Sequence, residues 1–479
     1  MNKNILLIGL GPHAIHIYMH FLEKIDLLPK LIVDLKSQEL RINNFLSEKK
    51  FNIDTIFIDD QYKNERELPI IVETKLLEAI NYNQINFAII STEAKSHYAY
   101  IKFLLLKTNV KILTDKPLTA PLNVINNEQQ AHQIYLDFIE LEALNKTFGE
   151  NRIFILCQRR WHDGFRYIYR LLESIVTNYE IPITNIICHH CDGTWNMPNE
   201  FIIRENHPYK YGYGKLFHSG FHFVDLISWL IEINFKLKDK FPNQVEMFAT
   251  MMQPADFIKI IDAKFYKRFF NTETYNSIFS SKDIFAGFGE IDFNGQIVFK
   301  RNERTITNVT LNLLQNGFSR RAWICLPEDT YKSNGRVRHE YLNINVGPIM
   351  NIQVHSYQAH HQKYETGVQI GEPGSPQHFD IYIYRNTALI GGQPVEKILC
   401  MDLIPREGDD FIGYNEHARK LCLQDFLYND HSQNESISAL KKYELCINLI
   451  ANFYAVLCKR NHNKDAITNF QLERRNYNE

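Results

Sequence analysis

The chain has 479 residues, 45% of them hydrophobic and 23% charged, and a chain of this length is expected to form two domains. Its 53 basic and 55 acidic residues give a formal net charge of −2, which gives no reason to expect nucleic acid or an anionic membrane as a partner. No apolar run approaches the length of a membrane span, and the start lacks the pattern of a signal peptide. The eight cysteines are scattered, so we expect reduced thiols and a cytoplasmic protein.

The chain begins with the pattern of a strand, a glycine-rich turn and a helix. Residues 5–8 are a short apolar run, typical of a strand buried on both faces. In the turn that follows, Gly9 permits a tight bend and Gly11 lets the backbone approach a pyrophosphate. Free N–H groups at the helix start favour phosphate. The predicted cofactor contacts here are Gly9, Gly11, Pro12, His13 and Ala14.

A second apolar run, residues 30–35, places Asp34 at its carboxyl end. The spacing from the turn is about that expected for an acid that binds the adenosine ribose. A carboxylate there accepts a hydrogen bond from the 2′-hydroxyl and repels a 2′-phosphate, so it predicts NAD. Lys36 and Arg41 nearby leave NADP open. A unit of this pattern that binds no ligand is the alternative.

Further strands are predicted at 55–60, 86–92 and 110–115, with helical patterns between them. Alternating strands and helices predict a doubly wound parallel sheet, a Rossmann domain over residues 1–150. Ligands of such sheets bind at the carboxyl ends of the strands, where Thr92 and the turn 115–117 lie. A lysine at that edge is either part of an ordinary exit turn or a catalytic group.

The middle of the chain carries two histidines on a predicted helix. A helical stretch (127–144) is followed by a strand at 152–160, a helix and a strand at 183–195. In the stretch 211–231 the glycines at 212 and 214 suit a loop, and the run that follows has helical periodicity. There His218 and His222 lie four residues apart and share a face, with Asp225 close to it. Three interpretations of these histidines are open: packed or solvated side chains, zinc ligands together with Cys188 and Cys191, or acid–base groups. Two strand ligands three residues apart diverge, so we predict no metal site.

Four segments occur in the order of the markers of one family. They are the turn 9–14, "TEAKSH" (92–97), Asp115-Lys116-Pro117, and "GYGKLFHSGFHFVD" (212–225). These segments span about the first half of the chain. In them the chain resembles the Gfo/Idh/MocA family, the glucose–fructose oxidoreductase and inositol dehydrogenase group. The resemblance implies cofactor contacts by Thr92, His97, Asp115, Lys116 and Pro117. "CQRRW" resembles the family's arginine-bearing strand end, which makes Arg160 a candidate substrate contact.

The chain departs from the family pattern at several positions. Asp115 stands in place of a glutamate, and Glu93 and Ala94 in place of proline and asparagine. His218 replaces an aspartate that commonly contacts the substrate in the family. A histidine can hydrogen bond a hydroxyl group, but without a fixed charge. This departure leaves open a different substrate or an altered activity.

The C-terminal half changes to a pattern of strands without helices between them. Residues 286–301 contain two alternating segments around Asn294-Gly295, which predict a hairpin turn. Further strand-like runs are 307–314, 320–326, 341–347, 351–357 and 379–384, and a closing helix is expected at 437–460. His355, His360 and His361 are substrate contacts, metal ligands or, as we favour, exposed loop residues.

We therefore expect a Rossmann domain (1–150) and an α+β domain (151–479) with a large, mainly antiparallel open sheet and insertions within 255–400. The resemblance implies helices on one face of that sheet and subunit contact, hence a homo-oligomer, through the other. It also implies an NAD(P)-dependent oxidoreductase acting on a sugar, polyol or sugar derivative. A nucleotide-linked sugar is also open, since arginines 159, 160 and 204 could meet phosphate.

We expect hydride to pass between the nicotinamide and a carbinol or carbonyl carbon. Lys116 would hold the reacting oxygen, and His222 would act as acid or base. His218 would orient the substrate, and Asp225 would orient the imidazole or touch the substrate. The alternative is a catalytically silent dinucleotide-binding or regulatory protein of the same family.

Overall fold

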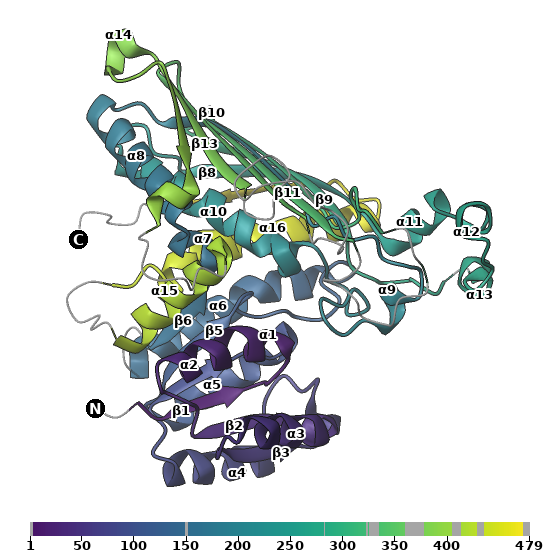
Figure 1. The fold of residues 1–479 in the computed structure, drawn as a ribbon. Coiled ribbons are helices and arrows are strands. Elements are labelled where there is room, and N and C mark those ends of the chain that lie inside the picture. The colour runs from purple at the N-terminus through teal and green to yellow at the C-terminus, as the bar shows by residue number, and fades with distance from the viewer. Residues whose placement is uncertain are drawn as a thin grey trace. The chain divides into compact units, whose positions relative to one another are not determined.

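The computed structural model describes residues 3–148, 152–281, 283–321, 324, 335–359, 378–404, 413–428 and 435–472. The chain divides into two compact units. The first consists of residues 1–121, 133–162 and 412–448, and the second of residues 122–132, 163–411 and 449–479. Each unit has its own sheet (Figure 1).

The first unit is built on a six-stranded parallel sheet with the order β3-β2-β1-β4-β5-β6. Its strands are β1 (Ile5–Ile8), β2 (Leu31–Leu35), β3 (Asp54–Ile58), β4 (Phe87–Ile90), β5 (Lys111–Asp115) and β6 (Ile153–Leu156). The central strand β1 is apolar and fully buried, as a strand covered on both faces requires. The strand order reverses between β1 and β4, which is where such sheets bind ligands. The predicted doubly wound sheet is confirmed.

The helices of this unit follow the predicted alternation. The helix after β1 has three parts: α1 (Pro12–Ala14), a π-helix (Ile15–Met19) and α2 (His20–Lys24). The others are α3 (Glu39–Lys49), α4 (Ile70–Tyr82), α5 (His97–Lys107), α6 (Glu128–Phe148), α7 (Gln158–Trp161) and α15 (Tyr414–Tyr428). Apolar residues of the helix after β1, of β1 itself and of α15 share one core cluster. A segment far along the chain, residues 412–448, therefore helps to build the first unit.

One strand of this unit is shorter than predicted. The strand expected over residues 152–160 ends at Leu156, and Gln158, Arg159 and Arg160 begin α7. The four apolar residues of β6 are enough to pair with β5. The side chains that follow are buried polar groups, and their hydrogen-bond partners lie outside the sheet.

The second unit is built on a nine-stranded sheet with the order β14-β13-β12-β11-β7-β10-β9-β8-β15. Its strands are β7 (Ile183–Cys191), β8 (Gln244–Met252), β9 (Asp292–Arg301), β10 (Arg304–Leu314), β11 (Val337–Val346), β12 (Met350–Ala359), β13 (His378–Arg385), β14 (Val395–Leu399) and β15 (Ile467–Gln471). Its neighbouring strands are antiparallel except β7 and β10, which are parallel. The sheet is thus mixed but mostly antiparallel, as predicted.

The two faces of this sheet differ in polarity. Along β11, Leu342 and Ile344 are buried and alternate with the partly exposed Tyr341 and Asn343. The helices α8 (Asp163–Tyr179), α10 (Phe221–Ile231) and α16 (Glu444–Asn461) run along one side of the sheet (Figure 1). The ring of Phe453 in α16 packs on Phe293 of β9. One face is therefore the apolar core, and the other carries mostly polar residues.

The predicted hairpin turn at Asn294-Gly295 is wrong. Both residues lie inside the continuous strand β9, and the turn to β10 is made by Asn302 and Glu303, which both have positive φ. Glycine is needed at 295 for packing, because an added Cβ would lie 2.7 Å from the Phe293 ring and 2.8 Å from the Phe453 ring. The Asn-Gly pair has the sequence of a turn but serves a close approach of two aromatic rings.

The remaining helices of the second unit are short. They are α9 (Glu200–Ile203), α11 (Pro254–Ile260), α12 (Ala263–Phe270), α13 (Asn276–Ser280) and α14 (Thr387–Ile390). His355 is not a loop residue but lies on β12, partly buried beside the rings of Tyr341 and Tyr382. His360, His361 and most of the run 320–326 lie outside the described residues. Within the described ranges, no helix is long and apolar enough to cross a membrane.

Candidate functional site

The glycine turn after β1 is tight at Gly9 and open at Gly11. Gly9 has a φ of +90°, and an added Cβ there would lie 2.6 Å from the Ser91 backbone oxygen, so only glycine fits. At Gly11 an added Cβ would meet nothing within 4 Å, so the space beside this backbone is open. The helix begins at Pro12, directly after it. The turn therefore leaves room for a pyrophosphate at the start of a helix.

Asp34, at the end of β2, is bonded to this turn. Its Oδ2 accepts a hydrogen bond from the Leu10 N–H at 2.7 Å, and its Oδ1 accepts one from the Leu35 N–H at 2.7 Å. Arg41 donates to the Leu10 carbonyl oxygen at 2.8 Å, and Lys36 pairs with Glu39. The acid is thus fixed against the glycine turn. The two basic residues that left NADP open have partners of their own.

Asp115, at the end of β5, is the centre of a second group of contacts. The Tyr18 and Ser91 hydroxyl groups both donate to its carboxylate, and His13 Nε2 lies 3.8 Å from Oδ2. Tyr18 comes from the π-helix after the glycine turn and is fully buried. Burial and the neighbouring Asp115 charge raise the pKa of Tyr18 well above its usual value. The predicted residues His13 and Asp115 are thus brought together, with the unpredicted Tyr18 and Ser91.

His97 connects two of the predicted segments. Its Nδ1 lies 2.9 Å from the Pro117 carbonyl oxygen, and its Nε2 lies 3.1 Å from the Thr92 carbonyl oxygen. The ring is buried, and that burial lowers its pKa. The "TEAKSH" segment is therefore fixed to the turn that carries Lys116. Lys116 itself follows directly after β5 and is partly exposed.

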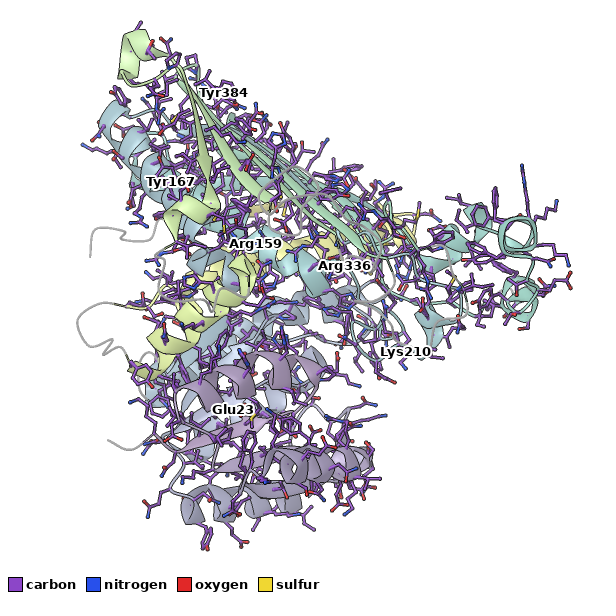
Figure 2. The ribbon with its side chains drawn as sticks, in the orientation of Figure 1. Glu23, Arg159, Tyr167, Lys210, Arg336 and Tyr384 are labelled. Atoms are coloured by element: carbon purple, nitrogen blue, oxygen red, sulfur yellow. The ribbon has the colours of Figure 1, made fainter. Side chains whose placement is uncertain are left out.

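Arg160 has partners within the first unit. Its guanidinium donates to the Lys442 carbonyl oxygen at 2.8 Å and stacks on the Tyr443 ring at 4.2 Å from the centroid. Arg159, labelled in Figure 2, is equally buried in α7. Both arginines take part in the packing of this unit. The predicted contact of Arg160 with substrate stays a prediction.

In the second unit, the two predicted histidines lie at a widened helical turn. Leu216–Gly220 form a π-helix, in which the Gly220 N–H donates to the Lys215 carbonyl oxygen five residues back, at 2.8 Å. Gly220 is required, because an added Cβ would lie 2.6 Å from that same oxygen. Helix α10 continues from Phe221 and carries His222 and Asp225. π-helices are rare and often mark functional sites.

His218 lies among aromatic rings. Its ring meets those of His207, Tyr209 and Tyr213 edge to face, with centroids 4.9, 5.3 and 6.1 Å away. His218, His222 and Asp225 are all buried. The sequence predicted the shared helix of these three residues, but it did not predict the ring contacts.

Glu290 holds the start of this helix in place. Its Oε1 accepts hydrogen bonds from the Leu216 N–H at 2.8 Å and from the Tyr454 hydroxyl at 2.9 Å. The carboxyl group is completely buried, and burial raises its pKa to about 7. A buried acid that titrates near neutral pH thus lies at the beginning of the π-helix.

Comparison with known proteins gives structural neighbours only. No protein-family model matches the sequence, and no curated protein does. The aldose-aldose oxidoreductase from Caulobacter crescentus, complexed with glycerol, matches at a TM-score of 0.56 and 11% identity, over 98% of this chain and 100% of that chain. An oxidoreductase from Agrobacterium radiobacter, in complex with NAD+, L-tartaric acid and magnesium, matches at 0.54 and 11%, over 98% of each chain.

A further neighbour is GenD2 from gentamicin A biosynthesis in complex with NAD, with a TM-score of 0.52 and 12% identity over 98% of this chain and 97% of that chain. The chain therefore has an NAD(P)-binding oxidoreductase fold. More particularly, the fold is that of oxidoreductases of the Gfo/Idh/MocA type, which confirms the resemblance seen in the motifs at the level of the fold.

The buried Glu290 predicts a pH dependence of stability. Because its pKa is raised on folding, the folded state holds this proton more tightly, and stability falls as pH rises from about 4.5 to about 7. Glu290→Gln removes the group. The quantity to follow is the difference in the free energy of unfolding, variant minus wild type. We expect this difference to increase by about 3 kcal/mol between pH 4.5 and pH 8.

Urea denaturation followed by circular dichroism at a series of pH values measures this difference. Glu303→Gln, at the exposed turn between β9 and β10, is the control. The free energy of unfolding of this variant, minus that of the wild type, is expected to stay constant across the pH series. A constant difference for Glu290→Gln would show that the carboxyl group ionises in the folded protein as readily as in the unfolded chain.

Proposed function

We propose that the protein is an NAD-dependent oxidoreductase acting on a carbinol or carbonyl carbon of a sugar, polyol or sugar derivative. The observation that carries this proposal is the hydrogen bond between Asp34 and the Leu10 N–H of the glycine turn. It puts a fixed carboxylate beside a turn that has room for a pyrophosphate. Because a carboxylate repels a 2′-phosphate, it favours NAD over NADP.

When bound, the nicotinamide supplies or accepts the hydride. Lys116 would hold the reacting oxygen and stabilise negative charge that develops on it. The hydrogen bond that the Tyr18 hydroxyl donates to Asp115 and the two contacts of His97 give the turn around Lys116 a rigid support. A positioned ammonium group contributes most when its scaffold does not have to reorganise during the reaction.

His222 would exchange the hydroxyl proton of the substrate, since a histidine can gain or lose a proton near neutral pH. His218 would meet the substrate one helical turn earlier, and Asp225 would orient the His222 ring or contact the substrate. The π-helix and Glu290 support this part of the proposal, because they fix the position of the helix start.

Two neighbours support a sugar-like substrate. One is named an aldose-aldose oxidoreductase and the other belongs to gentamicin A biosynthesis. A nucleotide-linked sugar finds less support, since Arg160 bonds to a backbone oxygen and Arg204 donates to Asn196 at 2.6 Å. The second candidate is a catalytically silent dinucleotide-binding or regulatory protein, which the histidine at position 218 in place of an acid favours.

The more polar face of the sheet in the second unit supports a homo-oligomer. Ile187 of β7 is 39% exposed, and Tyr384 of β13, which is labelled in Figure 2, is 38% exposed. Both lie on strands whose other residues alternate into the core. Polar side chains such as Asn343 and Asn351 hydrogen bond to each other across the same face. We infer that this face meets a second copy of the chain, as the resemblance implies.

The choice of NAD is tested by Asp34→Asn. Asparagine can still accept the Leu10 N–H but carries no charge, so the 2′-hydroxyl loses a charged acceptor and a 2′-phosphate is no longer repelled. We expect the Kd of NADH to rise about tenfold and that of NADPH to fall. Titrations followed by nicotinamide fluorescence measure both. Asp54→Asn is the control, because Asp54 begins β3 and so lies at the edge of the sheet opposite to Asp34, which is near the end of β2. An unchanged preference would remove Asp34 from the ribose site.

The catalytic proposal is tested by Lys116→Ala. Loss of the ammonium group removes charge stabilisation of the reacting oxygen, so hydride transfer is expected to fall at least a hundredfold while NADH binding changes less than threefold. Absorbance of the reduced nicotinamide is followed with panels of polyols, aldoses and nucleotide sugars. Lys30→Ala, at an exposed position before β2, is the control. Equal turnover by Lys116→Ala would contradict the assignment. Tight NADH binding without turnover on any panel would favour the silent protein.

A further inference from the structure

A cluster of buried charged side chains lies beneath the π-helix of the second unit. Lys215, the residue before the π-helix, has no exposed surface. Its ammonium group donates to Asp192 and to Ser219, the latter at 2.7 Å, and lies 3.2 Å from His190 Nδ1. Asp192 follows directly after β7, so the cluster joins the sheet to the helix that carries His218 and His222.

Asp192 is the fixed centre of this cluster. Its Oδ1 accepts a hydrogen bond from Arg336 at 2.7 Å, and its backbone oxygen accepts another from the same guanidinium at 2.9 Å. Arg336 is labelled in Figure 2, just before β11. Burial opposes ionisation of Asp192, but Lys215, His190 and Arg336 together outweigh it and hold its pKa well below the usual value. The carboxylate therefore stays charged.

Stability alone is a poor explanation for such a cluster. The cost of removing two charges from water is of the same order as the attraction between them, so a buried ion pair adds little net stability over apolar packing. Once formed, however, the pair fixes the groups that bond to it. One of those groups, Ser219, is partly exposed, whereas Lys215, Asp192, His190 and Arg336 are all buried.

The hydrogen bonds of Ser219 determine what it can still bind. A serine hydroxyl has one hydrogen to donate and two lone pairs that accept. Its hydrogen goes to Asp192 Oδ2 at 2.6 Å, and one lone pair accepts from Lys215. What remains is one acceptor lone pair on the hydroxyl oxygen of a partly exposed residue. Such a group can bind an O–H or N–H donor, but it has no hydrogen left for a carboxylate or phosphate oxygen.

We propose that Ser219 is a substrate-binding residue that accepts a hydrogen bond from a hydroxyl group of a neutral polyol or sugar, with Lys215 and Asp192 as its positioning residues. This inference rests on the proposed function and adds the class of substrate group that meets this part of the helix. Ser219 belongs to the π-helix and lies between His218 and His222. It therefore selects hydroxyl groups over anionic groups beside the proposed acid–base residue.

Two substitutions test the role of Ser219. Ser219→Ala removes the oxygen, and Ser219→Cys keeps a side chain of similar shape whose sulfur is a weak acceptor. Ser228→Ala is the matched control, because Ser228 lies on α10, which continues the π-helix, but is buried and donates to the Val224 carbonyl oxygen. Thermal unfolding of each variant is measured first, since Ser219→Ala also removes a partner from Lys215 and Asp192.

Binding of myo-inositol and D-glucose to the full chain, saturated with NADH, is measured by saturation-transfer NMR. We expect Ser219→Ala and Ser219→Cys to weaken binding about fivefold, as for the loss of one hydrogen bond, with the Kd of NADH unchanged. Ser228→Ala should bind like the wild type.

Equal polyol binding by the two Ser219 variants would overturn the inference. A wild type that binds NADH but neither polyol would also overturn it, while leaving the dinucleotide proposal intact. Failure of the wild type to bind NADH would instead contradict the proposed function.

Discussion

The hydrogen bond from the Leu10 N–H to Asp34 is the contact on which the candidate dinucleotide site depends. It joins the turn after β1 to the end of β2, and it forms because Gly9 takes a φ of +90° that sends the chain toward β2. A side chain at position 9 would collide with the Ser91 backbone, which belongs to the turn after β4. Gly9 thus lets the turn after β1 pass close to the turn after β4, at the edge of the sheet where α/β proteins bind their ligands.

The same local arrangement occurs in both units. In each, a π-helix brings a hydroxyl group to a carboxylate at the end of a strand: Tyr18 to Asp115 in the first unit, and Ser219 to Asp192 in the second. A π-helix widens the turn by one residue and redirects a side chain that a regular α-helix would place elsewhere. Both carboxylates accept more than one hydrogen bond, so each fixes the geometry of the residues around it.

The sequence predicted the parts of the fold that depend on local pattern. Apolar runs such as residues 5–8 identify buried strands, and the spacing from Gly9 to Asp34 identifies the acid at the end of the second strand. Asn294-Gly295 misled the prediction, because a turn and a close approach of Phe293 and Phe453 both require glycine.

The contacts of Tyr18, Lys215 and Asp192 were beyond sequence reasoning. Tyr18 fits the apolar stripe of its helix, and its partner Asp115 is 97 residues away. Lys215 is the kind of residue expected on a surface, and only the tertiary structure shows that Asp192 compensates its burial. The order of the four motifs, by contrast, predicted His97 and Asp115 from the sequence, because the segments that build one edge of the sheet occur in a fixed order along the chain.

Equilibrium binding of NADH to the wild-type chain tests the central claim most directly. The titration is followed by the fluorescence of the nicotinamide and repeated in the presence of ADP-ribose, which carries the ribose and pyrophosphate but no nicotinamide. The account predicts saturable binding of one NADH per chain at micromolar concentrations, displaced by ADP-ribose, because Asp34 and the glycine turn contact the shared part. Absence of saturable binding up to millimolar NADH, or binding that ADP-ribose does not displace, would contradict it.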